Sequence, residues 1–338
     1  MEQILKSRYR TGEKISESVF SVTYKGFYIG TDKPVIIKIY KRGTLNSSLI
    51  RQMRQKVKDF SLFNHSGIAK IIDGDYGWQG FYYVREFIDG SSLSDLLRQG
   101  EKFDLEKAVD VIKQTLVALE ITHAKNIVHG ALKPSNVFIE PPGTVKVADF
   151  VIEAVVKDAM PQKAIELIED AHYASPEELL GEPATPVSDL YSLTLILCEL
   201  VAGKPVLHQT GLKENIKKLK TSPFSPDATL PKYLADIIVK GLQKDPLLRF
   251  RSAGEFRESL EKKYIEPKPS STEEYVKIFE NSVTQYGGEE INQESEALRE
   301  VGRVRLRWSK EKHRNWILGV AVAVSVALGF LYTFIFGR

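Results

Sequence analysis

Two short stretches of the sequence carry side chains that could do chemistry. Residues 129–136 read HGALKPSN and lie between the apolar runs NIV and VFIE. Residues 145–150 read VKVADF, so that a carboxylate, Asp149, follows another apolar run. Lysine supplies positive charge, and carboxylate and amide oxygens are ligands for hard cations such as Mg²⁺. Ala131, in the middle of the first stretch, has no group that could accept a proton.

The order and spacing of these stretches resemble a protein kinase domain. The catalytic loop of that family follows H-R-D-L-K-x-x-N, so Gly130 stands at the arginine and Ala131 stands at the catalytic base. Further matches follow at the expected intervals: VREFIDGSSLSDLL, YASPEELLG, SDLYSLTLILCELVAGKP and LQKDPLLRF. The resemblance covers residues 9–264. It implies an α+β, two-lobed kinase-like fold, with a small β-rich amino-terminal lobe and a larger α-helical carboxyl-terminal lobe.

The resemblance assigns nucleotide-binding roles to single residues. Lys38, in VIIKIY, corresponds to the strand lysine that pairs with the α- and β-phosphates. Lys56 stands where the helical glutamate partner belongs, and two like charges at pairing distance repel each other. Glu86 lies at the hinge, which in the family contacts the adenine of the nucleotide. Arg85, just before it, occupies a position that is usually apolar or threonine, and could reach either Asp149 or solvent.

The phosphate-covering loop of the family has three glycines, which align here with Ser16, Ser18 and Ser21. Glycine lets the backbone approach phosphates closely, and serine narrows that freedom. Serine hydroxyls still donate hydrogen bonds, so nucleotide binding is expected to be weakened. An ordinary β-hairpin without a ligand is the alternative.

The metal-holding side chains of the family are retained. Asn136 and Asp149 match the two residues that would hold Mg²⁺, and Lys133 is retained in the same loop. The glycine that should follow Asp149 and Phe150 is Val151, and a β-branched residue cannot adopt the φ values of glycine. We therefore expect ATP with Mg²⁺ to bind weakly if at all, and neither to be required. A purely structural role for the retained side chains is the alternative.

The segment that phosphorylation orders in many kinases has lost that switch. Residues 151–174 contain no Ser or Thr, and their only Tyr is Tyr173. Activating phosphates pair with arginines, and the catalytic-loop arginine is Gly130 here. The run AIELIEDA, residues 164–171, instead predicts a short, permanently ordered amphipathic helix.

The packing residues of the family persist. Asp189 is expected to support the catalytic loop, and Glu177 is expected to pair with Arg249, although an ordinary surface charge pair is the alternative. The residues that stack through both lobes of active kinases are matched by Phe60, Ile71, His129 and Phe150.

Retained packing with lost chemistry favours a pseudokinase, a binding, scaffolding or regulatory module rather than an enzyme. The missing base alone is typically worth 10²–10⁴-fold in rate. The first alternative is an atypical but active Ser/Thr kinase that relies on Lys133 and on substrate-assisted proton loss. The second is a cleft that senses a lipid or another small ligand. A formal net charge of +3 gives no general argument for nucleic acid as partner.

The carboxyl-terminal region predicts a membrane anchor. Residues 316–336 are uncharged, and a 21-residue helix spans about 30 Å, the thickness of a bilayer core. A buried core helix is the alternative. The basic run before the span predicts that the amino-terminal domain stays on the cytoplasmic side, with protein partners there, in a single-pass, tail-anchored arrangement. Within the span, Gly319, Ala323 and Ala327 recur every four residues, a spacing that would allow a homodimer through the helix. The alternative is that small residues are simply common in transmembrane helices.

Hydrophobic periodicity predicts the secondary structure of the rest of the chain. Residues 9–40, 67–76 and 80–88 have strand-like patterns, and residues 49–63 have helical spacing with Ile50, Met53, Val57 and Phe60 on one apolar face. Helical patterns also cover residues 92–99, 104–126, 188–203 and 231–243. Residues 265–315 predict a polar linker that ends in a basic juxtamembrane segment. The single cysteine, Cys198, is expected to be an inert core thiol.

Overall fold

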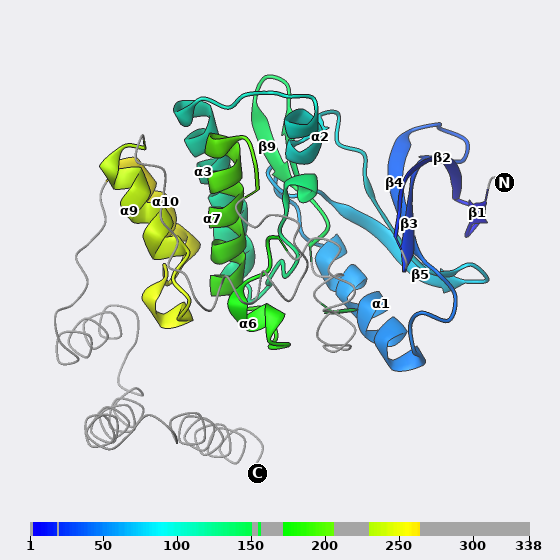
Figure 1. Ribbon diagram of the computed structural model, residues 1–338. Coiled ribbons are helices and arrows are strands. Elements are labelled where there is room, and N and C mark those ends of the chain that lie inside the picture. Colours follow the sequence, from blue (N-terminus) through cyan, green and yellow to red (C-terminus); the bar gives the residue numbers. More distant parts are fainter. Residues whose placement is uncertain (1–2, 19, 151–154, 157–171, 206–229, 264–338) are drawn as a thin grey trace, which may run out of the picture. The chain divides into compact units, whose positions relative to one another are not determined.

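The computed structural model describes residues 3–18, 20–150, 155–156, 172–205 and 230–263. Residues 1–265 are one compact unit. Within it, strands dominate up to residue 86 and helices dominate afterwards (Figure 1). The two-lobed arrangement expected from the sequence is therefore present.

The amino-terminal lobe, residues 3–86, is built on a six-stranded antiparallel sheet in the order β1-β2-β3-β4-β6-β5. Its strands are β1 (Ile4–Leu5), β2 (Tyr9–Glu17), β3 (Ser21–Tyr28), β4 (Pro34–Tyr40), β5 (Ile71–Gly77) and β6 (Gly80–Glu86). β-Branched and aromatic residues fill β4 and β6, and such side chains pack well on a half-buried pleated surface. The register places Lys38 opposite Tyr83 and Ile36 opposite Arg85.

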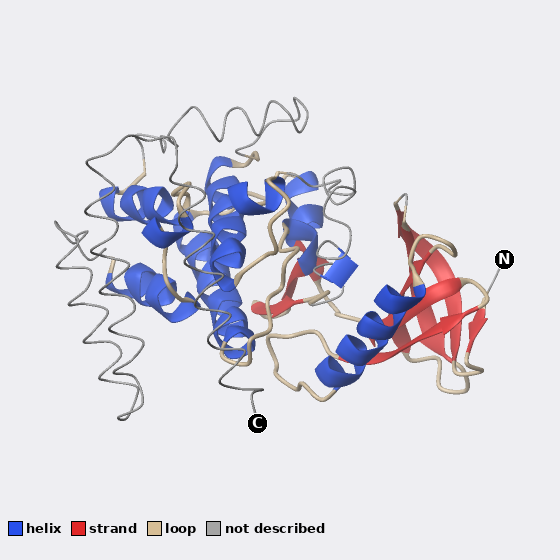
Figure 2. Cartoon of the chain, turned by 90° about the horizontal axis from the view of Figure 1, so that it is seen from below, coloured by secondary structure: helices blue, strands red, loops and turns tan. Residues whose placement is uncertain are grey.

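Helix α1 (Ser47–Ser61) lies beside this sheet in both views (Figures 1 and 2). The side chain of Asn46 caps it by accepting a hydrogen bond from the backbone N–H of Leu49 at 2.8 Å. The sequence pattern had placed Ile50 on the buried face, which is wrong in part: Leu49 is 1% exposed, and Ile50 is only partly buried. At 3.6 residues per turn, Leu49 lies nearer to the centre of the buried arc than Ile50 does.

The carboxyl-terminal lobe, residues 87–263, is mainly helical (Figure 2). The α-helices in its described part are α2 (Leu93–Arg98), α3 (Leu105–His123), α6 (Pro176–Leu179), α7 (Pro186–Ala202), α9 (Lys232–Gly241) and α10 (Ala253–Lys262). A small sheet of β7 (Ser91–Ser92), β8 (Val137–Glu140) and β9 (Thr144–Val147) carries the loop from residue 129 to residue 150. Hydrogen bonds between β8 and β9 therefore fix the two chemistry-bearing stretches relative to each other.

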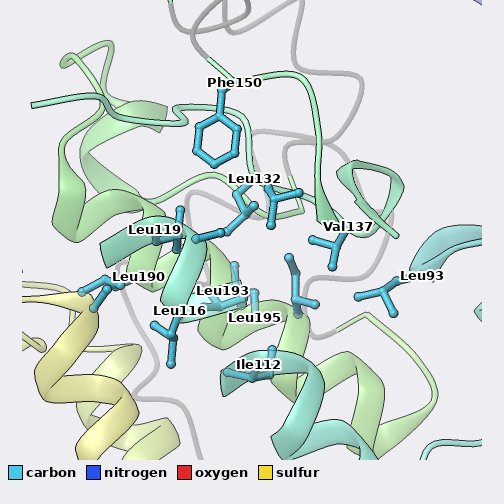
Figure 3. Packing of buried hydrophobic residues seen from close by; sticks show 14 of the residues in the cluster. Leu93, Ile112, Leu116, Leu119, Leu132, Val137, Phe150, Leu190, Leu193 and Leu195 are labelled. Atoms are coloured by element: carbon cyan, nitrogen blue, oxygen red, sulfur yellow. The ribbon is translucent and has the colours of Figure 1, made fainter. Parts of the chain in front are cut away.

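The core of this lobe forms where α3 meets α7. Leu116 and Leu119 of α3 gather with Leu193 of α7, next to Leu132 of the loop, with Phe150 at one end of the cluster (Figure 3). Cys198 lies in α7 at 3% exposure, and burial raises the pKa of its thiol. A buried, protonated thiol is a poor nucleophile, as expected from the apolar run around it.

The helices predicted at residues 92–99, 104–126, 188–203 and 231–243 are present, with ends shifted by at most three residues. Helix α10 was missed, because its sequence AGEFRESLEK has few apolar residues; Phe256 and Leu260 are buried beneath a polar surface. Among the described residues no helix is long and apolar enough to cross a membrane. The predicted span 316–336, the linker 265–315 and the short helix 164–171 lie outside those residues.

Candidate functional site

The loop at residues 129–136 is held by one buried carboxylate. Asp189 is 1% exposed and accepts hydrogen bonds from the backbone N–H of His129 at 2.8 Å and of Gly130 at 2.9 Å. His123 Nε2 lies 2.8 Å from the same side chain. The predicted supporting role of Asp189 is confirmed. Gly130 has φ +67°, a left-handed conformation that glycine adopts without the cost a side chain would add.

Ala131, at the position of the missing catalytic base, makes its hydrogen bonds through its backbone. Ala131 is 9% exposed, and its carbonyl oxygen accepts a hydrogen bond from Asn136 Nδ2 at 2.9 Å. The backbone N–H of Ala148 donates to the carbonyl of Asn136 at 2.8 Å, which fixes Asn136 beside β9. The amide of Asn136 therefore has the structural contact that the sequence left as an alternative. Ala131 contributes only a methyl group to the site.

Lys133 lies at the edge of a separate polar cavity of about 310 Å³. Its other walls include Arg98 from α2 and Glu199 from α7. Tyr173 donates its phenolic hydrogen to Glu199, and both side chains are at least partly buried. The cavity thus joins α2, the loop and α7.

Aromatic stacking connects the two lobes. The Phe150 ring lies 5.5 Å from that of Phe60 on α1 and 4.5 Å from that of His129, measured between centroids. His129 Nε2 donates to the carbonyl of Ala148 at 2.9 Å, and Nδ1 accepts from the backbone N–H of Ala131 at 3.2 Å. Ile71 belongs to the same buried cluster. The four stacking residues predicted from the sequence therefore lie together.

Asp149, the predicted metal ligand, is held by two side chains from strand β6. Arg85 Nε donates to Asp149 Oδ1 at 2.9 Å, and the Tyr83 hydroxyl donates to the same oxygen at 2.9 Å. The side chains of Arg85 and Asp149 are 7% and 15% exposed. Asp149 has φ +63°, a region that aspartate tolerates better than most residues. Of the two destinations open to Arg85, the structure shows Asp149.

The second contact of Arg85 is at the hinge. Its Nη1 donates to the backbone carbonyl of Glu86 at 3.1 Å. The Glu86 side chain is also engaged, since Oε1 accepts from the backbone N–H of Lys70 at 3.0 Å and lies 3.3 Å from Lys146 Nζ. The guanidinium lies 5.4 Å from the centre of the Phe138 ring. One buried cation therefore connects the hinge to the predicted metal ligand.

The predicted phosphate-covering loop is closed on itself. Ser18 Oγ accepts from the backbone N–H groups of Phe20 and Ser21, at 3.2 Å and 3.1 Å. Lys41 Nζ donates to the carbonyl of Ser18 at 2.8 Å. Ser21 is buried and Ser16 is exposed, paired with Thr23 across the β2–β3 hairpin. Among the described residues of this turn, the backbone N–H groups of Phe20 and Ser21 are thus used within the turn, as in the hairpin alternative.

The strand lysine and its replaced partner lie on different elements. Lys38 is half-buried on β4, with Nζ 5.9 Å from the centre of the Tyr40 ring. Lys56 on α1 is exposed to solvent. The lysine–glutamate ion pair of the family therefore has no counterpart in Lys38 and Lys56. Val151, the replaced glycine, lies outside the described residues.

A buried ion pair holds helix α6. Arg249 donates to both carboxylate oxygens of Glu177, at 2.7 Å and 2.8 Å, and Ser188 Oγ donates to Glu177 at 2.8 Å. Burial alone would raise the pKa of Glu177, but the hydrogen bonds and charge of Arg249 outweigh it, so that the pKa is lowered. The predicted Glu177–Arg249 pair is confirmed, and it is buried rather than on the surface.

Sequence reasoning missed Tyr83, although its neighbour carried a usable signal. Arg85 lies in GFYYVRE, a strand whose first six residues are buried. Arginine is almost never fully buried unless it is paired. A carboxylate partner was therefore required, and Tyr83, two residues earlier on the same strand face, could have been assigned to the same partner.

Comparison with known proteins agrees with this geometry. The family model of the protein kinase domain matches residues 9–265. The serine/threonine-protein kinase PknA of Mycobacterium tuberculosis is 31% identical over 263 residues, which cover 76% of this chain and 61% of PknA. PrkC of Bacillus subtilis, also a serine/threonine-protein kinase, is 25% identical over 348 residues, or 98% of this chain and 53% of PrkC.

A probable serine/threonine-protein kinase of Clostridium perfringens, CPE1738, is 28% identical over 268 residues, which cover 77% of this chain and 39% of that protein. This chain thus spans about 61% of the length of PknA and less of the other two relatives. All three relatives are named as serine/threonine-protein kinases.

Proposed function

Because the chain belongs to the protein kinase domain family, we propose that residues 9–265 form a pseudokinase: a binding, scaffolding or regulatory module that transfers no phosphate. The observation that carries this proposal is the buried bridge from Arg85 to Asp149 and to the carbonyl of Glu86. In an active kinase, the carboxylate at this position must be free to bind Mg²⁺. Here it is paired with the guanidinium of Arg85.

The bridge opposes metal binding through charge. A Mg²⁺ ion bound to Asp149 would come close to the Arg85 guanidinium and be repelled by it. Because the Arg85 side chain is only 7% exposed, little solvent screens this repulsion. Displacing Arg85 instead would leave a buried cation without its carboxylate, and breaking a buried pair costs roughly 3–5 kcal/mol. Either route weakens metal-dependent nucleotide binding. The retained Lys38 and Asn136 then leave, at most, weak binding of ATP.

The missing base acts on a later step. Even with nucleotide bound, Ala131 offers no group to orient or deprotonate an acceptor hydroxyl. General-base help is typically worth 10²–10⁴-fold. The two losses affect binding and chemistry separately, so a single substitution would not restore activity.

An active Ser/Thr kinase is the second candidate, and the names of the relatives favour it over a pseudokinase. The stacked Phe60, Phe150 and His129 are also what an active arrangement requires. In that case Lys133 and substrate-assisted proton loss would replace the catalytic base. The contacts of Arg85 and the methyl group of Ala131 are the reasons for preferring the pseudokinase.

Radiolabel transfer from ATP separates the two candidates. We expect residues 1–300 to incorporate no more phosphate, into themselves or generic protein substrates, than the double variant Lys38→Ala, Asp149→Ala. The double variant lacks both retained phosphate and metal contacts, so it sets the background. Incorporation above this background by the unmodified chain would establish the active kinase instead.

We further propose that residues 316–336 anchor the protein in a membrane, with the kinase-fold domain on the cytoplasmic side. Support comes from the uncharged 21-residue length and the basic run before it. Deleting residues 316–338 should move the protein to the soluble fraction. Replacing Gly319 and Ala323 by Ile should reduce self-association in the membrane if small residues form the dimer contact, and unchanged association would exclude that face.

A further inference from the structure

The charges of the kinase-fold domain are divided unequally between its lobes. Residues 1–86 contain 15 Lys and Arg against 8 Asp and Glu, a net charge of +7. Residues 87–265 contain 22 against 26, a net charge of −4. The chain as a whole carries only +3. The domain therefore has a strong charge polarity that its modest total conceals, and such a polarity orients a protein near a charged surface.

The outer face of α1 concentrates the positive charge. At 100° per residue, Arg51, Arg54 and Lys58 fall within one narrow stripe, opposite the buried Met53 and Phe60. All three cations are exposed. We call this stripe, together with the exposed Leu62 that ends it, the α1 outer face.

Little within the described residues neutralises these cations. Arg54 pairs with Asp75 at 3.0 Å, but its side chain remains 56% exposed. No ion pair is found for Arg51 or Lys58 in the part of the chain that the structure describes, and the one acid of α1, Asp59, accepts a hydrogen bond from Gln55 instead. Like charges three and four residues apart disfavour a helix. Folding does not require this pattern.

The face extends beyond the helix with the same character. Leu62, the carboxyl-terminal cap residue of α1, is 85% exposed, so that a large apolar side chain lies in solvent. The next residue, Phe63, is partly buried and has Lys125 Nζ 5.5 Å from its ring centre. The exposed Leu62 thus follows the cations of α1 in sequence and precedes a residue whose ring contacts a further cation.

From these observations we infer that the α1 outer face docks on an anionic lipid surface. A convex row of separate cations with a protruding apolar side chain matches mobile lipid headgroups above an apolar layer. An acidic peptide that binds clustered arginines is the competing occupant, and the test below separates it from a lipid surface. The inference uses only residues of the domain and does not depend on its catalytic state.

Residues 1–265 suit the test because they form one compact unit with their own core. Sedimentation with vesicles of phosphatidylserine and phosphatidylcholine measures the partition coefficient, and vesicles of phosphatidylcholine alone give the background. The double variant Arg51→Gln, Lys58→Gln removes two cations and keeps helix propensity. At about 1 kcal/mol per cation near such a surface, its partition coefficient should fall roughly 30-fold.

A matched control removes the same charge elsewhere on the same lobe. Arg8, between β1 and β2, and Lys33, before β4, are exposed cations outside the α1 outer face. The variant Arg8→Gln, Lys33→Gln should bind close to wild type, and all proteins should lose binding at high salt. Thermal unfolding of both variants should match wild type, which shows that binding rather than folding has changed.

Three results would overturn the inference. No binding to phosphatidylserine vesicles by the wild-type domain would exclude the lipid surface, as would binding only to an acidic polypeptide such as polyglutamate. Equal loss in both double variants would show attraction by net charge without a specific face. A failed vesicle assay leaves the radiolabel result for the pseudokinase unaffected, so that the two proposals fail separately.

Discussion

Replacing Arg85 by Met should weaken the fold and expose the charge of Asp149. Methionine keeps much of the volume of the side chain but removes the contacts to Asp149 Oδ1 and to the Glu86 carbonyl. Removing one partner of a buried ion pair costs roughly 3–5 kcal/mol. Asp149 keeps the hydrogen bond from Tyr83 and is 15% exposed, so we expect the lower end, about 3 kcal/mol.

Urea unfolding of residues 1–265 measures this loss, and a double-mutant cycle assigns it to the pair. Asp149→Asn removes the carboxylate charge that Arg85 neutralises, so the double variant should be more stable than the sum of the single effects predicts, by about 2 kcal/mol. Arg85→Lys is the matched control. It keeps the charge but not the fork that reaches two acceptors, and should lie between wild type and Arg85→Met.

A coupling energy near zero would refute the reasoning, because it would mean that the two side chains do not stabilise each other in solution. So would an Arg85→Met variant as stable as wild type.

Three further predictions concern the carboxyl-terminal lobe. Arg249→Met should cost about 3–5 kcal/mol in urea unfolding, since it leaves Glu177 buried without its cation; a loss typical of surface positions would show that the pair is not buried in solution. The lowered pKa of Glu177 means that the stabilisation is complete above the ordinary carboxyl pKa and is lost as the pH falls through the lowered value; Glu177→Gln should flatten the acid limb of the stability profile, and an unchanged limb would contradict this. Phe150→Ala should cost about 3–5 kcal/mol, because it removes the ring between Phe60 and His129, and a much smaller loss would argue against the stack. 

The lobes and most elements were predictable because their signals are local. The strand-like run GFYYVREFI and the helical run LTLILCELVAG are each recognisable from one segment. The first contains strand β6, and the second belongs to helix α7. Helix α10 was not predictable in this way, since only its tertiary neighbours show which side of a polar sequence is buried.

The site was predictable to the extent that it follows the family motif. The matches at Asn136 and Asp149 predict which side chains lie in the loop, and the match at Asp189 predicts the residue of α7 that supports it. The contacts of Asp189 and of the Phe150 stack agree with this pattern. The destination of Arg85 was open, because the sequence cannot tell whether a long side chain points across the cleft or out of it. The register of β6 and the left-handed φ of Asp149 decide this, and both depend on the fold.

The turn at Ser18 shows the same limit. Three serines in place of glycines suggested weaker nucleotide binding, but not that one hydroxyl would accept from the turn's own amides. Serine can bond to nearby backbone in several local conformations, and the chosen one depends on the neighbouring hairpin.

The most direct test of the account is a thermal-shift titration of residues 1–265 with ATP, with and without Mg²⁺, in wild type and Arg85→Met. A ligand at 100 times its Kd adds about 2.7 kcal/mol of stability. The account predicts that Mg²⁺ does not add to the stability of the wild type, because Arg85 is paired with the carboxylate of Asp149. It predicts a Mg²⁺-dependent gain in stability for Arg85→Met, which retains Lys38 and Asn136. Mg²⁺-dependent stabilisation of the wild type, at or above that of the variant, would contradict it.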